Sequence, residues 1–166
     1  MKTRLALPVL AACAALLAAP NARAGIADSP LPVLSAGATT LHLYSVPGVI
    51  AEVLGTYFSC TSTDTVTIQV GVELFGSLGG APANDAAATS LSVAPGATVI
   101  FGTGGAAGIF ISSSLGGGSF SKGSARILAT SKNLACTAFL ADRLNDPPTS
   151  MAQLTIIAKL KQKAAN

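Results

Sequence analysis

Strict alternation of apolar and polar side chains over residues 65–75 constrains the fold more than any other feature of this sequence. The apolar set is Val66, Ile68, Val70, Val72 and Leu74, and the intervening set is Thr65, Thr67, Gln69, Gly71 and Glu73. A two-residue period is typical of a β-strand with one buried face. We therefore predict a half-buried strand over 65–75, with Gly71 and Glu73 on its polar face.

Other short segments with strand-like composition are separated by turn residues. They are 39–45, 55–61, 90–93, 97–103, 109–111, 124–130, 134–142 and 151–161. Pro47-Gly48 is predicted to end the first segment, and Pro95-Gly96 favours a hairpin between 90–93 and 97–103. Residues 49–54 fit either a helical turn or a short strand. No long helix is indicated, so we predict an all-β fold of seven to nine strands.

Residues 1–24 have the organisation of a secretory signal peptide. Lys2 and Arg4 precede an Ala/Leu-rich run, and small residues surround the bond between Ala24 and Gly25. The apolar run is shorter than a confident membrane span. Cleavage at this bond removes 24 of the 166 residues and leaves 142, enough for one domain. We expect a secreted or periplasmic protein with an extended segment at 25–37 and a single β-domain at 38–166.

A lipid anchor is the alternative for the N-terminus. Cys13 follows Leu10-Ala-Ala, which has the form of a lipoprotein cleavage motif, and lipidation there would tether the protein to a membrane. The apolar run before Cys13 is short and continues beyond it, which favours cleavage after Ala24.

The charge of the exported chain argues against nucleic acid as a partner. The whole chain has ten basic and seven acidic residues, and three of the basic ones, Lys2, Arg4 and Arg23, lie in the leader. The remaining seven basic residues balance the seven acidic ones, so the basic character belongs to the leader.

Cys60 and Cys136 are the two cysteines outside the leader, and an even pair in an oxidising compartment predicts a disulfide. Cys60 precedes the strongest strand and Cys136 falls on the inward side of a late one. A bridge between the two layers of an antiparallel β-sandwich would explain both positions. We therefore predict an immunoglobulin-like sandwich in architecture, although the chain has no tryptophan to pack against the bridge.

One glycine-rich segment has the form of a dinucleotide-binding fingerprint. Residues 102–107 match G-x-G-x-x-A directly after an expected strand. The mechanism needs a helix immediately afterwards and an acidic residue about twenty positions on. The following residues are poor helix formers, and no carboxylate lies between Asp85 and Asp142. We interpret the segment as a loop and expect no cofactor.

Reactive groups do not converge in the sequence. Catalysis by a serine, histidine and carboxylate would have to use His42, the only histidine, and no nucleophile-elbow pattern is present. Asp142 and Asp146, with Asn145 between them, offer oxygens in one loop, but without the spacing of a calcium loop. No catalytic or metal site is therefore predicted.

A threonine-rich surface gives a possible glycan-binding or protein-binding face. Its residues are Thr56, Thr61, Thr63, Thr65 and Thr67. The nearby aromatic residues that such a face would use are Tyr44 and Tyr57. Threonine is also common on solvated sheet faces.

Several segments together resemble small exported bacterial proteins without an assigned activity. They are residues 60–61 with the alternating strand after them, 123–127 continuing to 130–132, 136–138 and 147–151. The resemblance covers most of the chain after the leader, and it implies secretion and a β-sandwich without supplying a catalytic residue.

The expected function is that of an exported non-catalytic module with a structural or protein-interaction role. Its partner would be an unidentified protein or surface, and residues 25–37 or the lysine-bearing last strand could support self-association through edge strands. The alternatives are an extracellular hydrolase that uses His42 and a carbohydrate-binding module. Function is expected in the loops at 76–88 and 104–123 or along an edge strand.

Overall fold

The computed structural model describes residues 25–105 and 108–159, and these residues form an all-β fold without a helix. The predicted signal peptide, the alternative lipid site at Cys13 and the residues after Lys159 lie outside the described part. In the described part no helix has the length and apolar character needed to cross a membrane.

Ten strands form one hydrogen-bonded sheet. They are β1 (Leu41–Ala51), β2 (Leu54–Ser62), β3 (Ile68–Gly76), β4 (Leu91–Val93), β5 (Thr98–Gly102), β6 (Ser113–Ser114), β7 (Phe120–Ala129), β8 (Leu134–Asp142), β9 (Met151–Leu154) and β10 (Ile157–Ala158). The ranges 55–61 and 134–142 were predicted closely, and the expected all-β class is confirmed.

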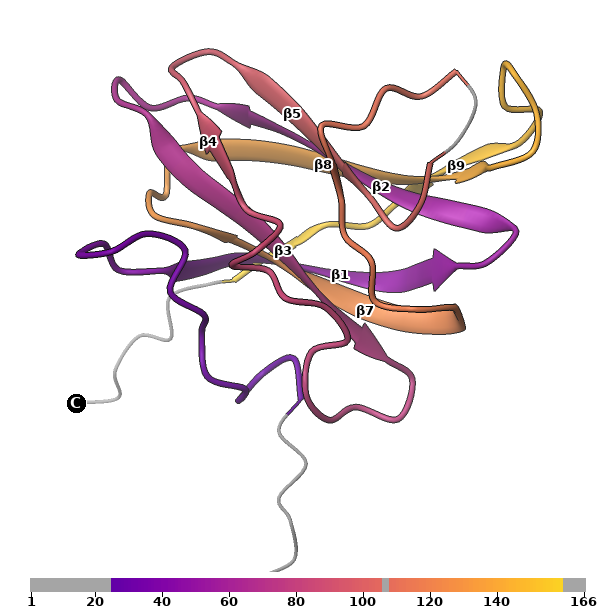
Figure 1. The fold of residues 1–166 in the computed structure, drawn as a ribbon, viewed down its shortest axis with the longest axis horizontal. Coiled ribbons are helices and arrows are strands. Elements are labelled where there is room, and N and C mark those ends of the chain that lie inside the picture. Colours follow the sequence, from indigo (N-terminus) through magenta and orange to yellow (C-terminus); the bar gives the residue numbers. More distant parts are fainter. Residues whose placement is uncertain (1–24, 106–107, 160–166) are drawn as a thin grey trace, which may run out of the picture.

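The strands fall into two groups of five that together make a nearly closed, barrel-like sheet (Figure 1). One group has the order β4-β3-β7-β1-β10, and the other has the order β6-β5-β2-β8-β9. The two groups are joined by one pair of strand residues, Ala51 of β1 opposite Gly55 of β2, next to the β1–β2 turn. Every pairing is antiparallel except that of β5 with the two-residue β6.

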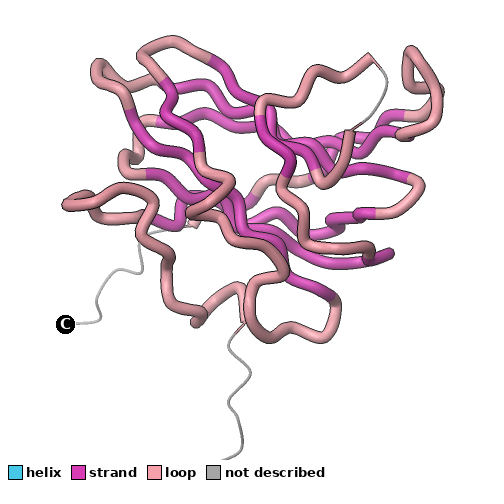
Figure 2. The backbone as a smooth tube through the Cα atoms, in the orientation of Figure 1, coloured by secondary structure: helices cyan, strands magenta, loops and turns pink. Residues whose placement is uncertain are grey.

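The main core consists of side chains that the strands turn inward. Val70, Val72 and Leu74 of β3 are fully buried there, as the alternation predicted. Phe58 of β2 and Phe101 of β5 join the same cluster. Figure 2 shows the strands in the middle of the molecule and the connecting loops around them.

The outer face of β3 differs from the prediction, because it is buried as well. Gly71 and Glu73 are both buried, and β3 is covered on both faces from Val70 to Phe75. A Cβ on Gly71 would lie 2.9 Å from the Leu34 side chain and 3.1 Å from the Ala86 carbonyl oxygen. Glycine is needed at this position because residue 34 and the loop at residue 86 pass directly over the strand.

Residues 25–34 cover this outer face and are held there by Arg126 of β7. The Arg126 side chain is 1% exposed, forms an ion pair with Glu73 and lies 5.2 Å from the centre of the Phe75 ring. Its two terminal nitrogens donate hydrogen bonds to the carbonyl oxygens of Ser29 at 3.0 Å and Pro30 at 2.9 Å. The N-terminal segment therefore packs against the outer face of the sheet and is not aligned along a sheet edge.

Several strand boundaries and one pairing also differ from the prediction. The strands on either side of Pro95-Gly96 do not form the predicted hairpin, because β4 pairs with β3 and β5 pairs with β2. β1 continues through Pro47 and Gly48, because register shifts against β7 on either side of Val49 accommodate the proline within the strand. The predicted last strand is two strands, β9 and β10, which pair with β8 and β1 respectively. The predicted strand at 109–111 is loop, and the adjacent strand is β6 instead.

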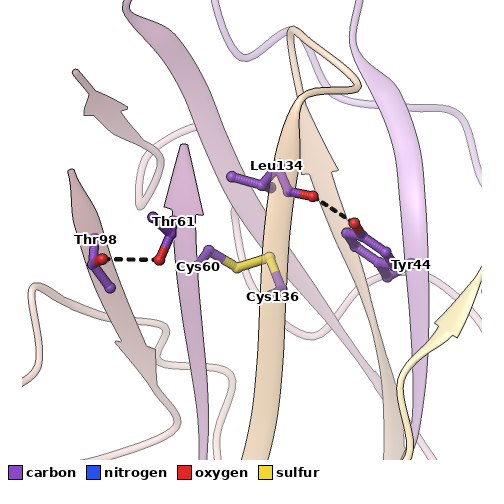
Figure 3. Close-up of a disulfide and its surroundings, with 6 residues drawn as sticks. All are labelled: Tyr44, Cys60, Thr61, Thr98, Leu134 and Cys136. Carbon is purple, nitrogen blue, oxygen red and sulfur yellow. Dashed lines mark hydrogen bonds between the residues drawn. A yellow bond between two sulfur atoms is a disulfide. The ribbon is translucent and has the colours of Figure 1, made fainter. Parts of the chain in front are cut away.

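The predicted disulfide is present, but it does not join two layers (Figure 3). Cys60 of β2 and Cys136 of β8 are directly opposite each other on neighbouring antiparallel strands, with their Cα atoms 4.1 Å apart. The disulfide therefore links two neighbouring strands, β2 and β8, within one group. Near the disulfide, the Tyr44 hydroxyl of β1 donates a hydrogen bond to the Leu134 carbonyl of β8. The sequence could not distinguish the two arrangements, since both place the cysteines on inward-facing strand positions.

The exposed edge of β3 is partly covered by a side chain. β4 pairs with β3 only between Ile68 and Val70. Beyond that point, the Asn84 amide donates a hydrogen bond to the Val72 carbonyl at 2.8 Å and accepts one from the Leu74 N–H at 2.7 Å. The loop at 76–88, one of the regions expected to carry function, thus satisfies the backbone groups of an edge strand.

Candidate functional site

Three loops meet at the end of the sheet where β1 turns into β2. We call this region the three-loop end and define it as residues 52–53, residues 103–105 with 108–110, and residues 143–150. Arg143 connects the loops: its side chain donates hydrogen bonds to the carbonyl oxygens of Glu52 at 3.0 Å and Gly105 at 3.2 Å. Its backbone N–H also donates to the Val53 carbonyl at 3.2 Å. One guanidinium thus fixes the relative positions of three loops that lie far apart in the sequence.

Asp142 organises the loop that follows β8. Its carboxylate accepts hydrogen bonds from the backbone N–H groups of Leu144 and Asn145 on one oxygen and from those of Thr149 and Ser150 on the other. Burial acts to raise the pKa of the Asp142 carboxyl, but the hydrogen bonds from Ser150, Asn145 and Thr149 outweigh it and hold the pKa far below its usual range. The carboxylate is ionised at neutral pH, and it links the two ends of the loop by binding residues 144–145 and 149–150.

The glycines of residues 102–108 allow close approach to this loop. A Cβ on Gly104 would lie 2.4 Å from the Arg143 guanidinium. Gly108 has φ of +75°, and a Cβ there would lie 2.6 Å from an Asp146 carboxylate oxygen. The segment with the form of a dinucleotide fingerprint therefore follows β5 as a loop, with no helix among its described residues; Ala106 and Ala107 lie outside them. Its glycines serve loop packing.

Apolar side chains project into solvent from all three loops. Val53 is 64% exposed, Leu144 78% and Phe110 85%, and Met151 at the start of β9 is 62% exposed. Beside them lies an apolar cavity of about 90 Å³ lined by Leu54, Leu140, Ser150, Met151 and Ala152. This volume is smaller than the roughly 150 Å³ cavity that holds a benzene molecule and far below the roughly 300 Å³ of small ligand sites. The cavity suits one aliphatic side chain.

Tyr57 lies beneath the three-loop end on the outer face of β2. It is fully buried, its ring stacks on Phe139 with centroids 5.4 Å apart, and its hydroxyl has no partner among the described residues. Burial raises the pKa of Tyr57; the Arg143 charge acts against this shift, and the Asp142 charge adds to it. Tyr57 is thus part of the support for the loops and offers no surface for a ligand.

His42 lies beside a serine hydroxyl, as a catalytic histidine would, but among the described residues its other ring nitrogen has no carboxylate partner. Its Nε2 lies 3.1 Å from both the Ser45 hydroxyl and the Tyr44 carbonyl oxygen, whereas the buried Nδ1 has no partner among the described residues. Burial, together with the charges of Lys159 and Arg126, lowers the pKa of His42 to about 4, and the hydrogen bond to the Tyr44 carbonyl opposes this shift. The charged neighbours are thus cations where a catalytic triad has a carboxylate.

The loop oxygens considered for calcium are not arranged for a cation. Both carboxylate oxygens of Asp142 already accept hydrogen bonds from the protein, two of them from the side chains of Asn145 and Thr149. Asp146 instead lies beside Gly108. Across residues 25–105 and 108–159, no group of three or more histidine, cysteine or acidic side chains is placed to hold a metal ion.

The threonine-rich surface is not a single face. Thr56 is fully buried, and its hydroxyl donates to the Ile50 carbonyl and accepts from the Ile50 N–H, both at 2.8 Å. Thr61 and Thr98 pair with each other across β2 and β5, with their hydroxyl oxygens 2.8 Å apart (Figure 3). The two tyrosines do not offer an open aromatic surface, because Tyr44 is partly buried against the core and Tyr57 is fully buried. The sequence grouped residues that the fold separates.

Arg143 is the residue of the three-loop end that the sequence did not indicate. The loop at 104–123 was expected to carry function, and its first part does belong to this region. Pro147-Pro148 indicates a loop at 143–150, but nothing in the sequence of this loop predicts which other loops it contacts. A comparison with protein-family models, with curated proteins and with solved structures found no match.

Proposed function

We propose that this chain is an exported, non-catalytic β-sandwich that acts as a protein-interaction module and binds its partner through the three-loop end. The observation that carries the proposal is the convergence of Val53, Phe110, Leu144 and Met151 from separate segments on one end of the sheet. Loops held on a rigid β-scaffold are common binding surfaces. The two strand groups would form the two layers, immunoglobulin-like only in that general sense.

The chemistry of the three-loop end favours a protein over a small molecule or a glycan. The cavity has the size of one aliphatic side chain, which suits an anchor residue of a protein partner. Exposed carboxylates of Glu52 and Asp146 border the apolar side chains, so a partner with a basic rim around an aliphatic anchor would be complementary. The Cys60–Cys136 disulfide supports an oxidising compartment, as expected for a secreted or periplasmic protein.

Site-specific cross-linking in the native cell tests this proposal. A photo-reactive residue at position 144 should give one discrete protein adduct. The same residue at position 66 should not give it, because Val66 is exposed at the opposite end of β2. Val66 and Met151 are both 62% exposed, so Met151→Glu and Val66→Glu are matched substitutions. Met151→Glu should remove the adduct and Val66→Glu should leave it.

Identical adducts from positions 144 and 66, or no adduct at position 144, would contradict binding through the three-loop end. The non-catalytic part has its own test in a broad hydrolase screen with the wild type and His42→Ala. Activity in the wild type that is lost in His42→Ala would establish an enzyme instead.

A further inference from the structure

Gly25 lies in a closed turn at the start of the described chain. Its backbone N–H donates a hydrogen bond to an Asp28 carboxylate oxygen at 2.6 Å. Its carbonyl accepts from the backbone N–H of Ser29 at 3.0 Å and from the Ser29 hydroxyl at 2.8 Å. Both polar groups of Gly25 are therefore bound by residues three and four positions further along the chain.

This turn is fixed to the sheet by a buried charge. Arg126 donates to the carbonyl oxygens of Ile26 at 3.4 Å, Ser29 at 3.0 Å and Pro30 at 2.9 Å. Ser29 itself is buried, whereas Asp28 is exposed. The Asp28 carboxylate is thus at the surface of a turn whose backbone is bound by Arg126, and one of its oxygens accepts the hydrogen bond from the Gly25 nitrogen.

We propose that this turn is a binding site for the protein's own mature N-terminus, formed when the bond between Ala24 and Gly25 is hydrolysed during export. An export-pathway peptidase would add one water across that amide: the Ala24 carbonyl carbon gains the hydroxyl and leaves as a carboxylate, and the Gly25 nitrogen becomes an ammonium. The inference rests on the proposed export, since only removal of the leader frees this nitrogen. The new ammonium then lies at hydrogen-bond distance from Asp28 and forms an ion pair there.

The charges around the Gly25 nitrogen decide how strongly the site holds it. Asp28 lies on the same segment as Gly25. Arg126 on β7 lies between this segment and the sheet, and its ion-pair partner is Glu73 on β3. The positive charge of Arg126 is balanced by Glu73, so Asp28 is the carboxylate left to act on the ammonium. Because Asp28 is exposed, solvent screens the pair, and we expect a moderate effect of about threefold on the proton affinity of the amine.

Titration of the α-amino group tests the site directly. The protein from Gly25 to the C-terminus, which contains every described residue, would be released from a fusion so that Gly25 is its first residue, and labelled with ¹³C-glycine. NMR should show the Gly25 amine losing its proton about half a pH unit higher than in Asp28→Asn. Glu52→Gln, which removes an exposed carboxylate on the β1–β2 turn, should leave the titration unchanged.

An extended protein that begins at Ala24 is the second comparison. Its amine is displaced by one residue and should titrate at the same pH with and without Asp28. The proposal is overturned if Asp28→Asn does not change the Gly25 titration, or if the extended amine responds to Asp28 equally. The mass of the exported protein tests export separately: an intact leader would refute the proposed export without affecting the titration of the purified protein.

Discussion

Two arginines in this protein bind loop carbonyls, and they do so in opposite environments. Arg126 projects from the middle of β7, is 1% exposed, and has Glu73 and the Phe75 ring as partners in addition to three carbonyls. Arg143 follows the last residue of β8, is partly exposed, and donates its side-chain hydrogen bonds to the carbonyls of Glu52 and Gly105. The only ion pair in the described part of the chain is that of Arg126.

The difference shows which contacts stabilise the fold and which only order a surface. A buried guanidinium requires a counter-ion, because an unpaired charge away from water is strongly unfavourable. A partly exposed guanidinium can return to water when its contacts are lost. Substitutions at the two positions should therefore separate folding from function.

The largest effect is expected from Arg126→Met. This substitution leaves Glu73 buried without a partner and releases the carbonyls of residues 26–30, so it should lower the free energy of unfolding by about 3–5 kcal/mol. Urea denaturation of the disulfide-bonded protein would measure it. The double variant Arg126→Met with Glu73→Leu should recover part of the loss, because it removes the orphaned charge. A loss below about 1 kcal/mol in the single variant would show that the pair is not buried in solution.

A smaller effect is expected from the lowered pKa of His42, which is caused mainly by burial and to a lesser extent by the charges of Lys159 and Arg126. Because the folded pKa of His42 is lowered to about 4 from an ordinary value of 6.5, the unfolded chain binds more protons between these values. The stabilising contribution is therefore complete above pH 6.5 and is lost as the pH falls toward 4. We expect a decrease in unfolding free energy of about 1 kcal/mol between pH 6.5 and 5, a moderate value for a half-buried group.

Denaturation midpoints at pH 6.5 and pH 5 would measure the His42 contribution, with His42→Gln as the variant that cannot titrate. The wild type should show the larger decrease between these two pH values. Equal decreases in the two proteins would mean that His42 does not titrate differently in the folded state.

The smallest change in stability is expected from Arg143→Ala. Water can replace its hydrogen bonds to the carbonyls of Glu52 and Gly105, so the free energy of unfolding should fall by less than about 1 kcal/mol. Hydrogen exchange should nevertheless become faster in the described parts of the loops at 103–110 and 143–150, and the cross-link from position 144 should weaken. Lys132→Ala, on the turn between β7 and β8, is the control. Unchanged exchange in both loops would contradict the role given to Arg143.

Local pattern predicted the strands better than it predicted their surroundings. Four of the five predicted inward residues, from Ile68 to Leu74, are buried in β3, because alternation reflects the pleat of a strand, which depends on neighbouring residues only. Val66 was wrong, since the strand begins at Ile68 and Val66 is exposed in the turn before it. The outward set was wrong in its expected exposure, since Gly71 and Glu73 are covered by residues 25–34 from a distant part of the chain. The disulfide partners were likewise correct, and the disulfide's position between neighbouring strands was not.

The candidate site was predictable only in part for the same reason. The glycine-rich loop after β5 was expected to matter, and composition was enough to exclude a helix there. That this loop meets Arg143 and the β1–β2 turn depends on the pairing of β2 with both β5 and β8. Such pairings link residues far apart in sequence, and no local pattern records them.

The sequence by itself determined the all-β class, most of the strands and the two cysteines that form the disulfide. It did so because turn chemistry and side-chain alternation act over a few residues. Only the tertiary structure decided that Arg126 is a buried anchor and Arg143 a tie between surface loops. Their roles depend on burial and on which distant carbonyls lie within hydrogen-bond distance, and these are fixed when the strands come together.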